Sequence, residues 1–269
     1  MLRTINDKNE LDKSLVWIRP DGGITEAMIL SGLLYGINSI KGKKFGMFRQ
    51  MPYSMLLYGH PAVAQFGIPP EDFNIVTTAY RMKEAPGAGD KRPYNIMSRI
   101  LEGSVIGPEK LWVSMEEDIT ASLKYFPVSS GAVFIATGRE SKGGFWDLKN
   151  WNMLAKMLEK HTGRPVIQIG NIRDERVDGA FDLRGRAGLK QTLALIREKA
   201  SAVISLDSYF HLGAKWAQKP AIVLWGSVER PAYGYDDQIN LENPAISDDN
   251  KVSFDPELVF EAAKKIIGK

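Results

Sequence analysis

The fold class is decided by the segment Ala202–Tyr235, which reads AVISLDSYFHLGAKWAQKPAIVLWGSVERPAYGY. Its apolar run Ala202–Leu206 predicts a buried strand, a helix follows, and Ala221–Trp225 predicts a second buried strand. Buried strands that alternate with helices are typical of a parallel sheet covered by helices. The segment therefore predicts an α/β protein.

Polar residues follow both predicted strands. Asp207, Ser208 and His211 come after the first strand, and Gly226-Ser227 comes after the second. Ligands of open parallel sheets bind outside the carboxyl ends of the strands, so this pattern favours a binding site. The alternative is ordinary α/β core, which explains Asp207 and His211 less well because they lie beside an apolar run. Asp207 suits a sugar or ribose hydroxyl, whereas His211 could contact a phosphate or hydrogen-bond Asp207 and order the turn.

The same alternation extends along the chain in two series, which predicts two parallel sheets. Strands are expected at Leu15–Arg19, Phe45–Phe48, Ile75–Ala79, Val133–Ala136, Pro165–Ile169 and Ala180–Leu183. Helices are expected at Thr25–Ser39, Ser54–Tyr58, Asn95–Leu101, Thr120–Tyr125, Leu148–Lys160, Leu189–Lys199 and Pro256–Ile267, the last with Asp255 as its cap. The natural boundary is Pro127–Gly131, giving domains 1–128 and 129–269, with the last helix packing back on the first domain as an option.

Composition narrows the chemistry. The 269 residues are 44% hydrophobic and 25% charged, which is ordinary for a globular protein. The absence of cysteine excludes disulfides and thiolate nucleophiles. The three histidines, His60, His161 and His211, show no metal-ligand spacing, so we expect no metal site.

The net charge of +3 is compatible with anionic partners such as nucleotides, phosphorylated glycans or an anionic membrane surface. Met1–Lys13 is charged and lacks the apolar region of a secretory signal. The apolar stretch Ala27–Ile37 is too short to span a bilayer. We therefore expect a cytoplasmic protein, with peripheral contact at the inner face of the membrane as an option.

The first strand is followed by the turn Arg19-Pro20-Asp21-Gly22-Gly23-Ile24-Thr25-Glu26. Glycines let the backbone approach a ligand, and the amino terminus of the next helix favours anions. The turn is not a nucleotide fingerprint, because it lacks the glycine spacings of those motifs. Glu26 has two interpretations: a carboxylate that caps the first helical turn, or a catalytic carboxylate that faces a cleft.

Two further turns follow strands in the second half. The loop Gly138–Trp146, GRESKGGFW, brings Arg139, Ser141 and Lys142 to a strand's carboxyl end, where glycine amides and cationic side chains suit a phosphate. An exposed polar loop explains these residues equally well. Gly170 follows the next strand on the same expected edge of the sheet.

With these residues in view, the chain resembles the heptosyltransferase-like family of GT-B glycosyltransferases, glycosyltransferase family nine. The resemblance covers nearly the whole chain and is strongest where D-S precedes His211, K-P stands at Lys219-Pro220 and a glycine turn follows at Gly226. In the first half, Arg19, Asp21, Gly22 and Gly23 match the family's R-x-D-G-x-G-D turn. Two departures stand out: Thr25-Glu26 replaces the family's Gly-Asp, and the D-S-x-x-H spacer is one residue short.

The resemblance implies two Rossmann-like domains and an inverting, metal-independent transferase without a cofactor. The donor would be a nucleotide-diphosphate sugar, ADP-heptose by default, and the acceptor a lipopolysaccharide core or another surface glycan or glycolipid. The implied donor-binding residues are Arg139, Ser141, Lys142, Gly170, Asp207, Ser208, His211, Gly226 and Ser227. Arg19, Asp21, Gly22 and Gly23 would lie on the acceptor side, with Glu26 as the base.

Two other functions stay open. One is a nucleotide-sugar-binding protein that has lost catalysis, which the Thr25-Glu26 replacement motivates. The other is a transferase that acts on protein or modified DNA. The sequence has no module that stacks on bases or reads a groove, so nucleic acid is not favoured as a partner.

Overall fold

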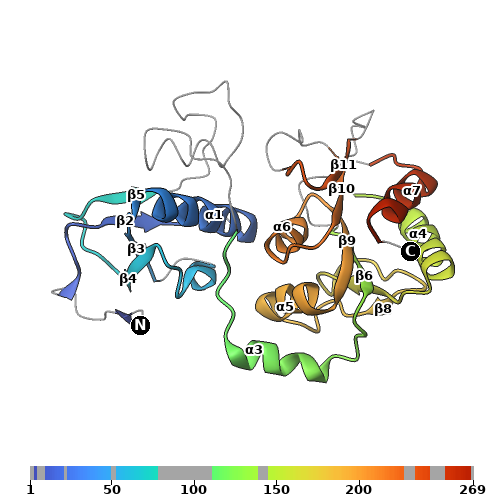
Figure 1. The fold of residues 1–269 in the computed structure, drawn as a ribbon, viewed down its shortest axis with the longest axis horizontal. Helices are drawn as coiled ribbons and strands as arrows, with labels where there is room; N and C mark the ends of the chain where they lie inside the picture. Colours follow the sequence, from blue (N-terminus) through green and yellow to red (C-terminus); the bar gives the residue numbers. More distant parts are fainter. Residues whose placement is uncertain are drawn as a thin grey trace. The chain divides into compact units, whose positions relative to one another are not determined.

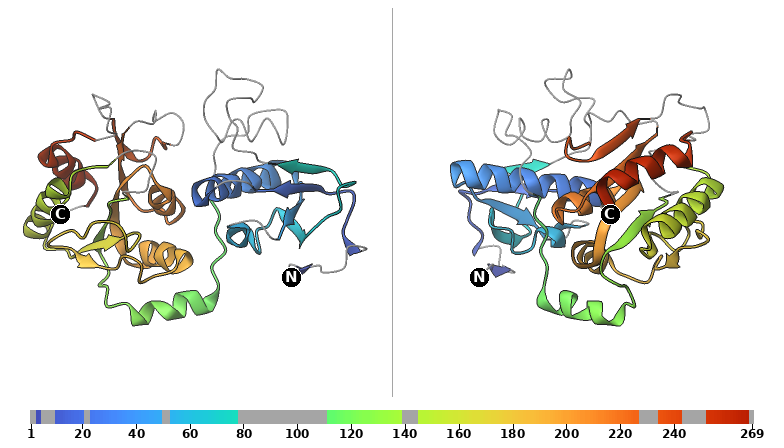
Figure 2. Two further views of the ribbon diagram at one scale, coloured as in Figure 1. Left: turned by 180° about the vertical axis from the view of Figure 1, so that it is seen from behind. Right: turned by 45° about the vertical axis from the view of Figure 1, so that its right-hand side comes forward.

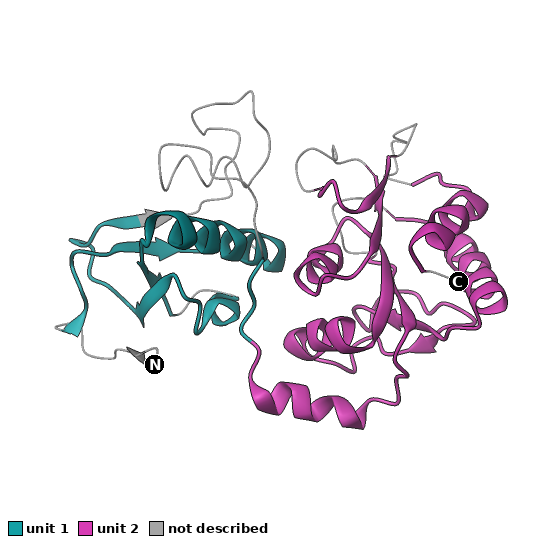
Figure 3. Cartoon of the chain, in the orientation of Figure 1, with its two compact units in different colours: residues 1–114 teal, residues 115–269 magenta. Residues whose placement is uncertain are grey.

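The computed structural model describes residues 3–4, 10–20, 23–49, 53–77, 111–138, 145–226, 234–242 and 252–267. Within these ranges the chain forms two compact units, Met1–Ser114 and Met115–Lys269 (Figure 3). Each unit is built around its own sheet, and all the strand pairings are parallel. The predicted α/β class with two parallel sheets is confirmed.

The first unit contains a five-stranded sheet in the order β1-β4-β3-β2-β5 (Figure 1). Its elements are β1 (Arg3–Thr4), β2 (Val16–Arg19), α1 (Ile24–Lys41), β3 (Phe45–Phe48), η2 (Ser54–Leu57), β4 (Val63–Gly67) and β5 (Ile75–Thr77). Strand β4 was not predicted. The chain leaves β2, forms α1 and returns to β3 on one side, whereas β5 lies on the other side of β2. The switch point of this sheet, where the strand order changes direction, therefore lies between β2 and β5.

Close packing in this sheet depends on one glycine. Gly46 of β3 lies beside Trp17 of β2, and a Cβ atom at Gly46 would stand only 2.3 Å from the indole ring. Trp17 is fully buried, and its ring meets Phe73 edge-on at 6.2 Å between centroids. The glycine thus makes room for the largest side chain of this core.

The second unit contains a six-stranded sheet in the order β11-β10-β9-β6-β7-β8 (Figure 1). Its strands are β6 (Ala132–Ala136), β7 (Val166–Ile169), β8 (Phe181–Asp182), β9 (Ala200–Leu206), β10 (Ala221–Trp225) and β11 (Ile239–Glu242). Numbered from β6, this is the order 3-2-1-4-5-6 of the Rossmann fold. The strand β11 was not predicted.

Helices cover both faces of this sheet, as both views in Figure 2 show. They are α3 (Glu117–Ser122) with the turn η4 (Leu123–Tyr125), α4 (Leu148–Thr162), α5 (Leu189–Lys199), α6 (Tyr209–Trp216) and α7 (Pro256–Ile267). One core joins the sheet to α4 and α7, and a second joins it to α5 and α6. The last helix therefore packs within the second unit, where the Asp255 carboxylate caps it by accepting a hydrogen bond from the Glu257 N–H at 3.0 Å.

The two units divide before α3, ahead of the predicted boundary at residues 128 and 129. The reason is that α3 and the segment after it pack on α5. Leu123 and Val128 belong to the core on that face, and Gln191 of α5 donates a hydrogen bond to Ser122 Oγ at 3.0 Å. The expected helix Asn95–Leu101 lies outside the described residues.

Candidate functional site

The reversal of strand order in the second unit marks the place where a ligand is expected. Strand β6 lies between β7 and β9, and the chain turns in opposite directions after β6 and β9. In open α/β sheets, ligands bind outside the carboxyl ends of the two strands at such a switch point. Those ends carry Thr137-Gly138 after β6 and Asp207-Ser208 after β9. Two of the predicted site residues therefore lie at the switch point.

Ser208 stands at the N-cap of α6 with extended backbone, yet its side chain does not cap the helix. Instead its hydroxyl donates a hydrogen bond to the Leu206 carbonyl at 3.1 Å. The first N–H groups of a helix need acceptors from outside the helix and favour negative charge. This end of α6 is therefore chemically suited to a phosphate.

His211 lies in the first turn of α6, and its ring is fully buried. Its Nε2 atom is 3.5 Å from Asp207 Oδ1, and its Nδ1 atom is 3.2 Å from Gln238 Oε1. The Trp225 ring packs edge-on against it at 5.6 Å. The His211 ring thus faces Asp207, as the second alternative expected, but the two side chains are not hydrogen-bonded. Asp207 itself lies nearer the surface, with 13% of its side chain exposed.

Gly170 follows β7 and has a structural reason to be glycine. Its φ of 140° is a backbone conformation that residues with a Cβ atom rarely adopt, and a Cβ atom here would stand 2.3 Å from Asp174 Oδ2. That carboxylate accepts a hydrogen bond from the Asn171 N–H at 2.9 Å and holds the turn together. Gly226 follows β10 at the same edge of the sheet.

The stretch Asp182–Gly185, D-L-R-G, contains a partly buried ion pair between Asp182 and Arg184. Arg184 donates hydrogen bonds from Nε and Nη2 to the two oxygens of Asp182, at 2.8 and 2.9 Å. These bonds lower the pKa of the Asp182 carboxyl to about 2. Arg184 also donates a hydrogen bond to the Asp174 carbonyl, which ties β8 to the turn after β7.

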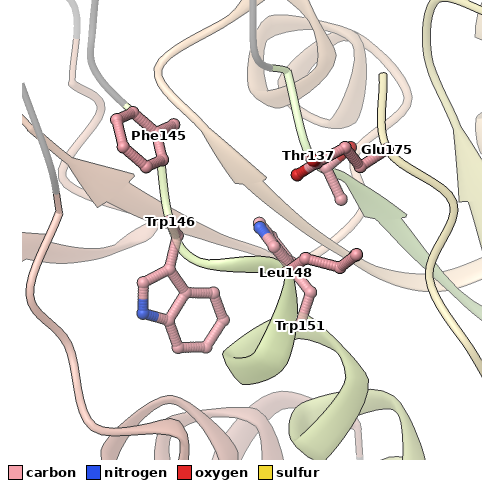
Figure 4. Close-up of a pocket in the computed structure, with 6 residues that line it drawn as sticks. All are labelled: Thr137, Phe145, Trp146, Leu148, Trp151 and Glu175. Atoms are coloured by element: carbon pink, nitrogen blue, oxygen red, sulfur yellow. The ribbon is translucent and has the colours of Figure 1, made fainter. Parts of the chain in front are cut away.

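A small pocket at this edge of the sheet was not predicted. It is lined by Thr137, Phe145, Trp146, Leu148, Trp151 and Glu175 (Figure 4). Gln168 of β7 donates hydrogen bonds to Thr137 Oγ1 at 3.2 Å and to the Glu175 carbonyl at 2.8 Å, which joins the two polar sides of the pocket. A glutamine inside the apolar run of β7 was the one sequence signal that could have revealed this link.

In the first unit, the predicted turn lies at the corresponding reversal, after β2. Arg19 is exposed at the end of β2, beside Thr77 of β5. Gly23 is the N-cap of α1, and its N–H donates a hydrogen bond to Glu26 Oε2. Glu26 is only 9% exposed. The capping interpretation of Glu26 is therefore realised in the structure.

The remaining predicted site residues lie outside the described part of the chain. They are Asp21, Gly22, Arg139, Ser141, Lys142 and Ser227. No group of three or more metal-ligating side chains occurs among the residues that are described. Within the same ranges, no helix is long and apolar enough to cross a membrane.

Comparison with known proteins supplies a fold. Neither a protein-family model nor a curated protein sequence matches the chain. Solved structures do match: a glycosyl transferase family 9 protein from Veillonella parvula has a TM-score of 0.73 at 11% identity, covering 94% of this chain and 97% of that one. The chain has the fold of these glycosyltransferases.

Two Escherichia coli structures agree with this result. ADP-heptose lipopolysaccharide heptosyltransferase II has a TM-score of 0.63 at 16% identity and covers 94% of this chain and 98% of its own. The iron-containing, dodecameric heptosyltransferase TibC, in complex with ADP-D-β-D-heptose, has a TM-score of 0.62 at 18% identity. That match covers 84% of this chain and 62% of TibC.

Proposed function

We propose that this chain is a glycosyltransferase that moves a sugar from a nucleotide-diphosphate donor to a glycan acceptor. The observation that carries the proposal is the amino terminus of α6, which the Ser208 side chain does not cap, with Asp207 beside it at the switch point of a Rossmann-like sheet. This arrangement suits the diphosphate of a nucleotide, and the fold is that of proteins whose names include heptosyltransferases. Heptose linked to ADP is the donor we test first.

On the donor side, the N–H groups at the start of α6 bind the diphosphate, and Asp207 accepts a hydrogen bond from a donor hydroxyl. Lys142, with Arg139 and Ser141, supplies positive charge and hydrogen bonds from the loop after β6. Gly170, Gly226 and Ser227 complete the backbone edge. These groups stabilise the charge that builds on the leaving diphosphate, which is the work that a divalent ion does in metal-dependent enzymes.

On the acceptor side, Glu26 accepts the proton of the attacking hydroxyl, while Arg19 and the turn Asp21–Gly23 position the acceptor. The acceptor oxygen forms a bond to the anomeric carbon as the bond to the diphosphate oxygen breaks. A single displacement of this kind inverts the anomeric centre. A lipopolysaccharide core is the acceptor that the family resemblance favours, and net positive charge is compatible with a phosphorylated glycan.

The Glu26→Gln variant tests the proposed base without removing the cap. Glutamine at this position of a capping box still accepts a hydrogen bond from the backbone, so α1 keeps its first turn. It has no carboxylate to take a proton, and loss of a general base typically costs about 100- to 10,000-fold in rate. We expect transfer from ADP-heptose to fall by at least roughly 100-fold while the dissociation constant for ADP stays the same.

The matched control is Glu257→Gln, which removes a carboxylate from the first turn of α7. It should leave both transfer and ADP binding unchanged. Undiminished turnover in Glu26→Gln would remove Glu26 from the mechanism. The donor class is tested separately by thermal-shift screening with ADP, UDP, GDP and CMP, since a ligand at 100 times its dissociation constant stabilises the native state by about 2.7 kcal/mol.

A second candidate function is suggested by the pair Thr25-Glu26, which stands where the resembling family has Gly-Asp. In this case the chain binds a nucleotide sugar without catalysing transfer. Calorimetry that shows tight ADP binding by the native protein, together with no transfer and no donor hydrolysis, would favour this binding protein over the enzyme.

A further inference from the structure

The side chain of Gln238 contacts both the buried ring of His211 and its backbone. The Gln238 Nε2 atom donates a hydrogen bond to the His211 backbone carbonyl at 2.8 Å, and Gln238 Oε1 lies 3.2 Å from His211 Nδ1. Gln238 is 7% exposed and His211 is 0% exposed. Both contacts are therefore made away from water, where a mismatched pair of polar groups is costly.

Gln238 is itself fixed in place by Asn240. The Asn240 Nδ2 atom donates hydrogen bonds to the carbonyls of Gln238 and Tyr235, each at 2.9 Å. Its Oδ1 atom accepts a hydrogen bond from the Trp225 indole N–H at 2.8 Å. The segment ahead of β11 is thus anchored on β10, beside the His211 ring.

The two contacts from the Gln238 side chain to His211, which we call the Gln238 clamp, set the position of one proton on the imidazole. A backbone carbonyl can only accept a hydrogen bond, so the amide nitrogen of Gln238 must face the His211 carbonyl. The amide oxygen then faces Nδ1, and this second contact is favourable only when Nδ1 carries a proton. Gln238 therefore selects the form of His211 that is protonated at Nδ1.

The other ring nitrogen faces Asp207. Nε2 is buried, has no hydrogen-bond partner among the described residues, and lies 3.5 Å from Asp207 Oδ1. With the proton fixed on Nδ1, a neutral ring would direct the Nε2 lone pair at a carboxylate oxygen. One additional proton, on Nε2 or on Asp207, makes that contact attractive. The pair then carries no net charge instead of one negative charge.

We propose that Gln238 is a positioning residue that fixes the proton on His211 Nδ1, so that the Asp207–His211 pair holds a further proton and presents no net charge to the donor diphosphate. The inference rests on the proposed function for its ligand. Asp207 lies beside the start of α6, where a negative charge would repel the phosphates. A pair without net charge keeps the hydrogen-bonding groups and removes the repulsion.

The position of the proton can be read directly from the ring nitrogens of His211 by ¹⁵N NMR. The chain has three histidines, so the signals are assigned by comparison with His211→Gln. In the native protein we expect Nδ1 to be protonated. In Gln238→Met the contacts from Gln238 are lost, and we expect Nδ1 to be unprotonated while Nε2 carries a proton that it donates to Asp207. Gln238→Asn, whose side chain is one methylene shorter and cannot make both contacts, should likewise lose the proton from Nδ1, and it keeps the test available if the methionine variant folds poorly.

The consequence for binding is measured with ADP by calorimetry. Gln238→Met restores one negative charge near the diphosphate, and we expect the dissociation constant for ADP to rise roughly tenfold. The control is Gln65→Met in the first unit, which removes a carboxamide that likewise contacts two backbone groups, the Asp12 N–H at 2.9 Å and the Glu10 carbonyl at 3.5 Å. It should leave the affinity unchanged.

The outcomes distinguish a failure of the proposed role of Gln238 from a failure of the proposed function. An unprotonated Nδ1 in the native protein, or an unchanged tautomer in Gln238→Met, overturns the role of Gln238. A changed tautomer with unchanged ADP affinity overturns the link between the pair's charge and the donor. If the tautomer behaves as expected and the native protein binds no nucleotide, the clamp stands and the proposed function fails.

Discussion

His60 makes the stability of the first unit depend on pH. The ring is 1% exposed, and both nitrogens are used by the backbone: Nδ1 accepts a hydrogen bond from the Ala62 N–H, and Nε2 lies 3.0 Å from the Ser31 carbonyl. Trp112 packs edge-on against the ring at 4.8 Å. A second proton would have to sit on Nδ1, where it would face the Ala62 N–H. Burial therefore lowers the pKa of His60 from 6.5 to about 4.

The size of the effect follows from linkage. Because the folded pKa lies below the unfolded one, the unfolded chain takes up a proton first as the pH falls. Stability is fully present above about pH 6.5 and is lost progressively down to about pH 4. A fall in the His60 pKa from 6.5 to about 4 limits the total loss of stability to about 3.4 kcal/mol, of which about 1.8 kcal/mol is lost between pH 7 and pH 5.

The assay is urea denaturation at pH 7 and pH 5, comparing the native protein with His60→Gln. Glutamine can accept and donate hydrogen bonds but does not titrate, so the variant should lose about 1.8 kcal/mol less than the native protein over this range. The comparison cancels the contribution of the carboxylates, which both proteins share. Equal losses in the two proteins, or an NMR titration that places the His60 pKa near 6.5, would refute the reasoning.

Two further substitutions test the turns around the second sheet. Gly170→Ala should destabilise the second unit by about 1–3 kcal/mol in thermal or urea denaturation, because the new Cβ would press on Asp174 in a backbone conformation that alanine rarely adopts. A neutral result there would mean that the turn after β7 relaxes freely. Asp255→Ala should cost about 1 kcal/mol by removing the cap of α7, and Asp255→Asn should restore most of the loss. Equal stability of the alanine and asparagine variants would show that the side chain does not cap the helix in solution.

Long apolar runs were the part of the fold that sequence could predict well. The bounds of α5, β10 and α7 were predicted as the structure has them, because their periodic apolar residues are enclosed by Gly188, Pro220 and Asp255. The strands β4 and β11 were missed. Each is short and interrupted by polar residues, Gln65 in one and Asn240 in the other, so its pattern does not differ from that of a loop.

In the candidate site, too, some positions could be predicted from the sequence and others could not. The positions of Asp207 and Ser208 at the end of β9 were predictable because both residues directly follow a buried apolar run. The approach of His211 to Asp207 was an explicit alternative, since residues four apart share a helix face. Gln238 gave no signal, because its partner lies 27 positions away and is reached only through the strand β11 that the sequence concealed. Contacts of this kind depend on the order of strands in the sheet, which periodicity does not encode.

The two interpretations of Glu26 are compatible once the geometry is considered. The cap uses Oε2, through the hydrogen bond from Gly23, and a carboxylate has a second oxygen with its own lone pairs. A carboxylate tied to the backbone is also held in one orientation, which is what a base needs, since a misplacement near 1 Å can cost about 100-fold in rate. The extra methylene of glutamate, compared with the aspartate of the resembling family, allows the side chain to fold back and make this bond within α1. The cap therefore does not count against catalysis, and only the change from carboxylate to carboxamide separates the two roles.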